Sequence, residues 1–324
     1  MSTRHSLLSA LSDGQFHSGT ALGDQLGVSR AAVNKAIQGL IDRGLEIHSV
    51  SGKGYRWITP TGLLNRELIE SRLQGLAVRN VPGIIVVDEI ESTSSYLLDR
   101  MSQDLLVSEV CLTEHQTNGR GRRGRQWISS PYQNLTMSIS WRYDTGPSRL
   151  SGLSIAVGIA IVRALRSVGV EGVELKWPND VLHGGRKLAG ILVDLRGEVD
   201  GPTHIVVGVG LNVRLHADTS GAIDQAWTDL SSITSKSIDR NEIAALLIHE
   251  LGKVLADYST EGLNPYLQEW KKWHAFENKK VRIIQNEREI SGTVCGLDES
   301  GALQLDTGEK MIKVHSGEVS LRAG

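Results

Sequence analysis

The sequence is poor in cysteine, with only Cys111 and Cys295 among its 324 residues. These two residues lie far apart, each within an apolar, strand-like run, which favours buried thiols over a disulfide or a metal site. A chain without disulfides suits a reducing compartment. We therefore expect a cytoplasmic protein.

Long apolar runs and a surplus of either charge are also missing. No uninterrupted apolar stretch approaches the roughly 20 residues that cross a membrane, and the N-terminal apolar stretch is too short for a signal peptide. The 35 Lys and Arg residues face 37 Asp and Glu residues, for a net charge of −2. This balance excludes a protein that coats nucleic acid through overall basic charge, so any contact with nucleic acid must come from a local patch.

What is present indicates a folded chain of two or three domains. A length of 324 residues exceeds a comfortable single domain. The content of 40% hydrophobic and 22% charged residues is close to the globular average. The sequence shows no low-complexity tract and no internal repeat.

Residues 1–60 have the pattern of a winged helix-turn-helix DNA-binding domain. Leucines recur at helical spacing in a first helix, Ser18 caps a short second helix, and Ser29 caps a third helix with one apolar stripe. "LEIHSV" and "YRW", joined by the turn residues "SGKG", predict a hairpin wing. The segment carries a modest basic charge, as DNA binding requires.

The third helix and the wing present side chains of the types that contact phosphates and base edges in a major groove. The predicted DNA-binding residues are Ser29, Arg30, Asn34, Lys35, Gln38 and, on the wing, Lys53, with Arg56 near it. The alternative is a three-helix scaffold whose polar face only meets solvent.

Residues 61–275 predict a mixed-sheet α+β domain, and residues 276–324 predict a small β-barrel. The stretch 59–62 predicts a linker in front of them. Strand-like runs alternate with a long helix over 153–168, and two further helices, over 239–258 and 264–274, end the larger domain. Short alternating strands separated by polar turns follow from Lys279 onward.

The stretch "GRGRRGRQW" at 119–127 has the glycine spacing of a dinucleotide-binding turn. Such a turn opens a helix, which Pro131 and the preceding Ser-Ser pair disfavour here, and the chain has no P-loop sequence. Glycines let backbone amides converge on an anion, and arginines add permanent positive charge. The combination suits a polyphosphate or a charged adenylate, and an RNA-binding Gly-Arg segment is the alternative.

Three further stretches carry polar residues at strand ends. "ESTSSY" places Ser92 and Thr93 after a strand, "KWPNDV" places Asn179 and Asp180 in a turn, and "GRKLAGIL" places Lys187 beside a glycine-containing backbone. Taken singly, these features fit a helix cap, a tight turn and a solvated lysine. Taken together, they indicate a site.

Four stretches, in their order and spacing, closely resemble the motifs of biotin protein ligases. They are "QTNGRGRRGRQW", "KWPND", "RKLAGIL" and "GVGLN". With the helix-turn-helix at the front, the whole chain is similar to the bifunctional type, which is biotin ligase and biotin operon repressor in one polypeptide. Lipoate ligases share the fold but carry different motifs. The resemblance implies a central domain of the biotin/lipoate ligase type and an SH3-like C-terminal barrel.

The resemblance also implies a two-step reaction that uses ATP and Mg²⁺. The carboxylate of biotin joins the α-phosphate of ATP, and the resulting biotinyl-AMP passes its acyl group to a lysine of the biotin carboxyl carrier protein of acetyl-CoA carboxylase. Biotinyl-AMP would also act as corepressor, promoting a homodimer that binds operator DNA of the biotin operon. Because two anions meet in the first step, the site requires fixed cations and the exclusion of water.

By the same resemblance, residues of these motifs take individual roles. The implied catalytic residues are Lys187, which bridges the biotin carboxylate and the α-phosphate, Arg122 and Asp180. The implied biotin-binding residues are Ser92, Thr93, Gln116, Gly119, Arg120, Gly121, Arg122, Lys187, Gly190 and Gly208. The implied adenylate- and ATP-binding residues are Arg122, Arg123, Arg125, Trp127, Asn179, Lys187, Asn212 and Trp227. No side chain is assigned to the metal.

Two alternatives keep only part of this function. One is a ligand-sensing repressor without catalysis, against which the intact Lys187 and the complete Gly-Arg loop argue. The other is a monofunctional ligase with a non-functional N-terminal domain. By the resemblance, the Gly-Arg loop at 119–127 is a lid that orders over the intermediate. The chain departs from the family pattern at Asn118, where Ala or Gly is common, and over residues 213–226, so the departures concern this lid rather than the chemistry.

Overall fold

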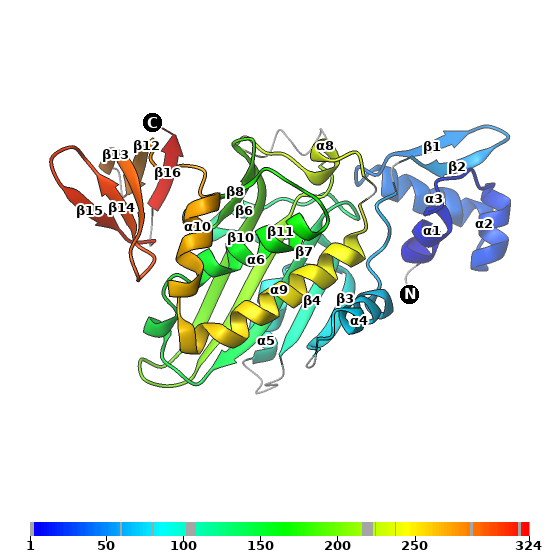
Figure 1. Ribbon diagram of the computed structural model, residues 1–324. Coiled ribbons are helices and arrows are strands. Elements are labelled where there is room, and N and C mark those ends of the chain that lie inside the picture. The colour runs from blue at the N-terminus through cyan, green and yellow to red at the C-terminus, as the bar shows by residue number, and fades with distance from the viewer. Residues whose placement is uncertain are drawn as a thin grey trace.

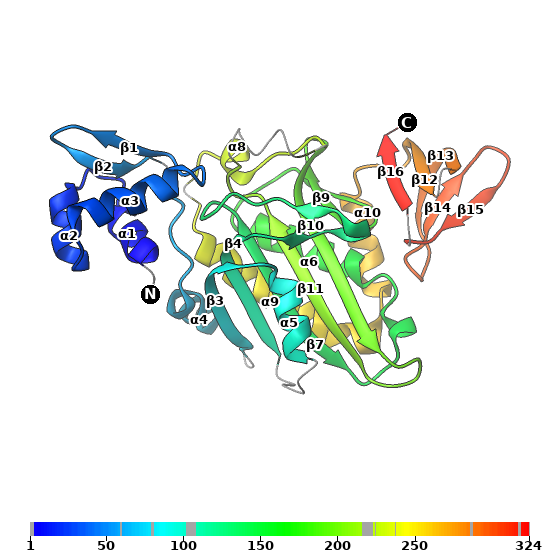
Figure 2. The same cartoon turned by 180° about the vertical axis from the view of Figure 1, so that it is seen from behind.

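The computed structural model describes residues 3–58, 60–78, 81–101, 108–215, 223, 225–236, 238–285, 288–316 and 319–323. Within these ranges the chain forms a helical domain with a β-wing, a seven-stranded central sheet with helices, and a C-terminal five-stranded sheet. Figures 1 and 2 show these three units in a row, with the central sheet between the two smaller units.

The N-terminal domain is a winged helix-turn-helix, as predicted. Its elements are α1 (Thr3–Leu11), α2 (Gly19–Leu26), α3 (Arg30–Ile41), β1 (Ile47–Val50) and β2 (Gly54–Trp57). The hydroxyl groups of Ser18 and Ser29 cap α2 and α3 by accepting hydrogen bonds from the amides of Ala21 and Ala32 at 3.0 and 3.2 Å. Gly27 ends α2 in the left-handed conformation, with φ 65°. The antiparallel pair of β1 and β2 forms the wing.

The core of this domain includes one residue from the central domain. Its buried members are Leu7, Leu8, Leu11, Leu22, Val33, Ile37, Leu40, Leu45, Ile47, Trp57 and Tyr132. Tyr132 is 1% exposed, and Arg43 Nη1 lies 2.5 Å from Glu89 Oε2 on the central sheet. Apolar packing and an ion pair therefore hold the two domains together.

The predicted mixed sheet forms the centre of the molecule. Its strands are β3 (Gly83–Ile90), β4 (Glu109–Gln116), β7 (Leu135–Tyr143), β8 (Val173–Lys176), β9 (Asp180–His183), β10 (Arg186–Gly197) and β11 (Thr203–Leu211). They lie in the order β3-β4-β7-β11-β10-β9-β8. The pair β3 and β4 is parallel, and the other neighbours are antiparallel.

Helices cover both faces of this sheet. One face carries α4 (Arg66–Gly75), α6 (Leu153–Ser167), α9 (Arg240–Glu261) and α10 (Leu267–Trp273), and the other carries α5 (Thr93–Met101) (Figures 1 and 2). The shorter helices are η2 (Pro147–Leu150), α8 (Leu230–Ile233) and η3 (Asn264–Tyr266). The three helices predicted from the sequence are confirmed, the last of them beginning as the 3₁₀ turn η3.

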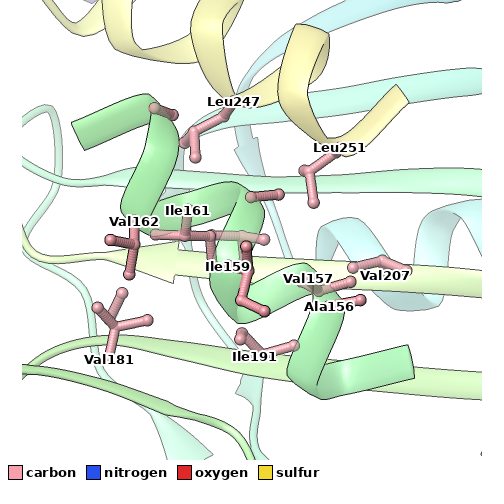
Figure 3. Close-up of a cluster of buried hydrophobic side chains, with 14 of the residues drawn as sticks. Ala156, Val157, Ile159, Ile161, Val162, Val181, Ile191, Val207, Leu247 and Leu251 are labelled. Carbon is pink, nitrogen blue, oxygen red and sulfur yellow. The ribbon is translucent and has the colours of Figure 1, made fainter. Parts of the chain in front are cut away.

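Helix α6 is apolar and buried over most of its length, and its charged residues Arg163 and Arg166 lie near its C-terminal end. Figure 3 shows Ile159 and Val162 of α6 among side chains of the sheet, such as Ile191, and of α9, such as Leu247. Among the described residues, the helical stretch Pro147–Ser167 is long and apolar enough to cross a membrane, and 67% of its most apolar window is buried inside the protein. This burial identifies it as a core helix.

The C-terminal unit is a small antiparallel β domain at the place where the sequence predicts a β-barrel. Its strands are β12 (Lys280–Gln285), β13 (Arg288–Leu297), β14 (Leu303–Asp306), β15 (Met311–Val314) and β16 (Val319–Ala323), in the order β15-β14-β13-β12-β16. Among the described strands, β15 and β16 are edges and do not pair with each other. Trp177 Nε1 donates a hydrogen bond to the Gly301 carbonyl at 3.1 Å, which ties this unit to the central domain.

The predicted linker, 59–62, and the two residues after it pack against the central domain, and Thr59 lies outside the described residues. Thr61 Oγ1 donates to the Tyr132 carbonyl at 2.5 Å, and the Leu64 amide donates to Glu114 Oε1 at 2.6 Å. Glu114 also pairs with Arg240 at 2.7 Å, with both side chains buried. The chain that leaves the N-terminal domain is therefore fixed by a buried polar cluster.

One expectation about cysteine was wrong. Cys111 on β4 is buried, and burial raises the pKa of its thiol to about 12. Cys295 on β13 is exposed. Side chains alternate along a strand, and β13 directs Val294 into the core, which leaves Cys295 on the outer face.

Candidate active site

Two pockets adjoin each other, and one of them lies where β3 and β4 end. Because these strands are parallel, Thr93 after β3 and Gln116 at the end of β4 reach the same edge of the sheet. We call the inner pocket the one that contains nine of the ten predicted biotin-binding residues: Ser92, Thr93, Gln116, Arg120, Gly121, Arg122, Lys187, Gly190 and Gly208. The tenth, Gly119, lies at its mouth.

The outer pocket contains all eight residues predicted to bind the adenylate, together with Asp180. They are Arg122, Arg123, Arg125, Trp127, Asn179, Lys187, Asn212 and Trp227. Arg122, Trp127, Asn179 and Lys187 line both pockets. The structure thus brings together predicted residues that range from Ser92 to Trp227 in the chain, and Lys187 lies at the junction.

The inner pocket has a floor of uncharged hydroxyl and amide groups. The Thr93 amide donates to Gln116 Oε1 at 2.8 Å, and Ser138 Oγ lies 2.7 Å from Thr93 Oγ1 and 2.9 Å from Ser94 Oγ. Ser92 is buried and also caps α5, because its Oγ accepts a hydrogen bond from the Ser95 amide at 3.3 Å. Such a floor suits a neutral polar group that both donates and accepts hydrogen bonds.

Sequence reasoning missed Ser94 and Ser138. Ser94 directly follows Thr93 in "ESTSSY", so the motif contained a signal for it. Ser138 lies within the strand-like run "NLTMSIS", and only the pairing of β7 with β4 and β11 shows that its hydroxyl faces the pocket. A polar residue in a buried strand is the signal that could have indicated it.

Glycines let the Trp127 ring lie directly on the sheet. Gly190 and Gly210 are opposite each other in the β10–β11 pair. A Cβ atom at Gly210 would lie 2.6 Å from two Trp127 ring atoms, and one at Gly190 would lie 2.9 Å from the ring. At Gly208, a Cβ atom would lie 2.7 Å from Ser94 Oγ. These glycines therefore keep the wall of the inner pocket flat.

The Gly-Arg loop is a small two-stranded ribbon. It consists of β5 (Gly119–Arg120), the 3₁₀ turn η1 (Arg122–Gly124) and β6 (Gln126–Trp127). Arg123 and Gly124 both have positive φ, at 62° and 70°. No α-helix follows the loop before β7, which confirms that it is not a dinucleotide-binding turn.

Arg122 connects the loop to the two pockets and to the C-terminal domain. Its Nη1 donates to Asn179 Oδ1 at 3.1 Å, and its Nη2 donates to the Ser316 carbonyl. Burial lowers the pKa of the guanidinium below its usual value, and the nearby Asp180 opposes this effect. The Asn179 side chain is in turn anchored to β10, because its Nδ2 donates a hydrogen bond to the Ile191 carbonyl at 2.9 Å.

The outer pocket combines one carboxylate with several cations. Lys187 Nζ lies 2.8 Å from Asp180 Oδ1, and Lys176 Nζ lies 3.7 Å from Asp180 Oδ2. Burial lowers the pKa of Lys176. Lys176 and Arg322 also line this pocket and were not predicted. "KWPND" contained a signal for Lys176, whereas nothing in the sequence places the C-terminal Arg322 there.

Two predicted adenylate residues hold backbone in place. Asn212 Nδ2 donates to the carbonyls of Lys187 and Thr228 at 3.3 and 3.1 Å. Trp227 forms a parallel bridge with Lys187, which fixes the described end of the 213–226 segment against β10. Residues 216–222 and 224 of that segment lie outside the described residues.

The predicted DNA-binding face is exposed. Ser29, Arg30, Asn34, Lys35, Gln38 and Lys53 are all exposed in the N-terminal domain. Gln38 Nε2 donates to Asp42 Oδ1 at 2.9 Å. On the wing, Lys53 and Arg56 lie over the Phe16 ring, at 5.9 and 5.8 Å from its centroid.

These features define a class of protein. A pocket floored by neutral polar groups opens onto a pocket lined by cations, with Lys187 at the junction. Fixed cations at such a junction suit the approach of two anionic groups, such as a carboxylate and a nucleotide phosphate. The same chain carries a winged helix-turn-helix domain. The fold and site therefore describe a carboxylate-activating enzyme with a DNA-binding domain.

Comparison with known proteins places this class in a family. Three family models match: the Biotin/lipoate A/B protein ligase family over residues 86–212, the Biotin protein ligase C terminal domain over residues 278–322, and an HTH domain over residues 3–56. The bifunctional ligase/repressor BirA of Escherichia coli K12 is 42% identical over 317 residues, which cover 98% of this chain and 96% of that protein.

A second relative and a solved structure are also biotin ligases. The biotin–[acetyl-CoA-carboxylase] ligase of Mycobacterium tuberculosis is 34% identical, over 72% of this chain and 87% of that protein. The Aquifex aeolicus biotin protein ligase in complex with biotin and ATP superposes with a TM-score of 0.63 at 26% identity, over 75% of this chain and 99% of that one. The chain belongs to the biotin protein ligase family, in its bifunctional ligase/repressor form.

Proposed function

We propose that the protein activates biotin with ATP and transfers it to a lysine of a biotin carboxyl carrier protein, and that biotinyl-AMP also controls its binding to operator DNA. The observation that carries the proposal is the position of Lys187, which lines both pockets. A ligand that spans the two pockets places its central bond beside this ammonium group.

The inner pocket takes biotin. The ureido group has two N–H donors and one carbonyl acceptor, and the floor of Thr93, Ser94, Gln116 and Ser138 offers complementary hydroxyl and amide groups. The Trp127 ring, lying on Gly190 and Gly210, covers the apolar part of the ligand. The biotin carboxylate then points toward Lys187.

In the first step, a carboxylate oxygen attacks the α-phosphate of ATP, and pyrophosphate leaves. Two anions must approach each other, so fixed positive charge is the main requirement. Lys187 supplies it at the reacting atoms, and Arg122, Arg123 and Arg125 supply it along the phosphates. Mg²⁺ bound with ATP would supply further positive charge at the leaving pyrophosphate.

Asp180 is the carboxylate of the outer pocket that fits the metal. Among the described residues, no group of three His, Cys, Asp or Glu side chains is arranged to hold a metal ion by itself. Asp180 would hold the ion together with the phosphate oxygens of ATP. In the second step, Asp180 orients the ammonium group of the acceptor lysine and takes up its proton.

The edge of β10 supports a homodimer and the docking of the carrier protein. β9 pairs with β10 only as far as Gly190, so one edge of residues 192–197 carries no partner strand among the described residues. Leu195 on this stretch and Val199 beyond it are 44% and 83% exposed. A second copy of the chain and the carrier protein would compete for this edge.

In this scheme residues 1–60 bind operator DNA, residues 61–275 carry out the chemistry, and residues 276–324 complete the outer pocket through Arg322. Biotinyl-AMP acts as corepressor to the extent that it prefers the dimer, because a ligand shifts an equilibrium only by its difference in affinity. The protein acts in the cytoplasm, where ATP and carrier protein are available.

The test of the ligase is direct. The protein is incubated with biotin, ATP, Mg²⁺ and a carrier domain, and biotin on the carrier is measured. We expect transfer that requires all four components. The absence of transfer by the wild-type protein would leave the ligand-sensing repressor without catalysis as the function.

The test of the repressor uses DNA from upstream of the biotin genes of the same genome. We expect binding in a gel-shift assay to increase when biotinyl-AMP is present, and Lys35→Ala to weaken it. Binding that does not respond to biotinyl-AMP would favour the monofunctional ligase with a non-functional N-terminal domain.

A further inference from the structure

Arg120 and Asp194 form a bidentate salt bridge at the mouth of the inner pocket. Arg120 Nη1 donates to Asp194 Oδ2 and Nη2 donates to Oδ1, each at 3.2 Å. The side chain of Asp194 is 21% exposed, and that of Arg120 is 40% exposed. Gly119, Gly121 and Leu192 line the same mouth. Asp194 belongs to none of the four sequence motifs.

The position of Asp194 follows from strand alternation. Gly190 and Leu192 on β10 line the inner pocket, and Asp194, two residues further, projects from the same face. β10 pairs with β11 from Ala189 to Gly197, and Asp194 lies opposite Val206. The carboxylate is therefore attached to the rigid part of the domain.

The partner of Asp194 lies on a much weaker element. The ribbon of β5 and β6 has only two residues in each strand, and two-stranded ribbons are marginally stable on their own. Glycines on both sides of Arg120 add backbone freedom. An anchor between the Arg120 side chain and the sheet therefore reduces the conformations open to the backbone from Gly119 to Gly121.

We propose that Asp194 is a positioning residue for biotin, which holds Arg120 and so keeps the backbone from Gly119 to Gly121 against the inner pocket. This inference rests on the proposed assignment of the inner pocket to biotin. Asp194 touches no substrate itself. Because the ion pair is partly exposed, it contributes little to global stability, so its loss changes ligand binding without unfolding the protein.

A second surface ion pair provides a matched control. Arg142 Nη2 lies 3.0 Å from Asp144 Oδ1, at the end of β7 and outside both pockets, and Asp144 is 85% exposed. Asp144→Asn removes the same charge as Asp194→Asn. An effect that appears only at position 194 therefore arises from its contact with the loop.

The experiment measures the Kd of biotin alone by calorimetry for the wild type and both variants. We expect Asp194→Asn to weaken binding about fivefold, which corresponds to about 1 kcal/mol, and Asp144→Asn to leave it unchanged, with equal melting temperatures. In pyrophosphate-release assays with ATP and no carrier domain, Asp194→Asn raises the biotin concentration that gives half-maximal release and leaves the maximal rate unchanged. The double variant Arg120→Asp with Asp194→Arg binds biotin more tightly than Arg120→Asp alone.

Two results would overturn the inference and leave the ligase function intact. One is a Kd for Asp194→Asn within twofold of the wild-type value. The other is a double variant that binds no better than Arg120→Asp. A wild-type protein that binds no biotin would instead overturn the proposed function, and with it this inference.

Discussion

Lys187 Nζ lies 2.8 Å from Asp180 Oδ1, and the same carboxylate reaches Lys176 at 3.7 Å. The three groups are partly buried in the outer pocket, with side-chain exposures of 15 or 16%. Asp180 thus holds two ammonium groups in place before any phosphate arrives. A cation that is fixed beforehand stabilises a developing charge without the cost of reorganisation.

Lys187→Ala should abolish most of the adenylation activity. The variant loses the cation at the junction of the pockets. The negative charge of Asp180 then repels the phosphates, because Lys187 no longer neutralises it. We expect pyrophosphate release from ATP and biotin to fall by about 10²–10³-fold. Lys253→Ala, at an exposed lysine of α9 that pairs with Glu250, is the control and should retain full activity. A loss of less than tenfold in Lys187→Ala would remove this lysine from the reaction.

Arg122→Gly should release biotinyl-AMP prematurely. The substitution removes the contacts with Asn179 and the Ser316 carbonyl and takes a guanidinium from both pockets. A hydrogen bond of a charged group contributes about 1.5–3 kcal/mol, so the loss of one such bond to the adenylate should accelerate dissociation by about 10–150-fold. The measurement is retention of labelled adenylate after rapid gel filtration. Arg149→Gly, at an exposed arginine outside both pockets, is the control, and equal retention in the two variants would contradict the lid role.

Gly210→Ala should block the inner pocket. A Cβ atom there would lie 2.6 Å from two Trp127 ring atoms, so the ring must leave the sheet and enter the space for biotin. Overpacking of this kind costs about 1–3 kcal/mol, and we expect the Kd of biotin to rise by about 5–150-fold. Gly252→Ala is the matched control, because a Cβ atom there meets nothing within 4 Å. Biotin binding of wild-type strength in Gly210→Ala would show that Trp127 does not border the biotin site.

His274 should make the protein sensitive to acid. Its ring is buried and stacked on Trp270 with centroids 3.9 Å apart, and neither ring nitrogen has a hydrogen-bond partner among the described residues. Burial, with a smaller effect of Lys279, lowers the pKa of His274 to about 3. Below the unfolded pKa of about 6.5, the unfolded chain binds a proton that the folded chain does not, so stability falls as the pH falls.

The size of this effect can be tested with His274→Phe. Between pH 7.5 and 5.0 the wild type should lose about 2 kcal/mol of unfolding free energy that the variant retains. Urea unfolding at pH 7.5 and pH 5.0 measures the difference. At pH 7.5 the two proteins should be of similar stability, because an apolar ring replaces a neutral ring without hydrogen bonds. Identical losses in both proteins would show that His274 is protonated in the folded state.

Features that depend on nearby residues could be predicted from the sequence. The helices of the N-terminal domain, their Ser18 and Ser29 caps and the long α6 follow from periodicity and capping, which act over a few residues. The four motifs and their resemblance to biotin protein ligases indicated most of the site, including Lys187. The absence of a helix after the Gly-Arg loop followed from Pro131 in the same way.

Only the tertiary structure decided how distant segments meet. The pairing of β10 with β11 puts Gly190 opposite Gly210 and so makes room for Trp127, and the packing of the C-terminal sheet brings Arg322 to the outer pocket. Ser138, Asp194 and the exposed Cys295 depend on which face of a strand is buried. That choice is made by strand pairing over long sequence separations, and a shift of one residue would reverse it.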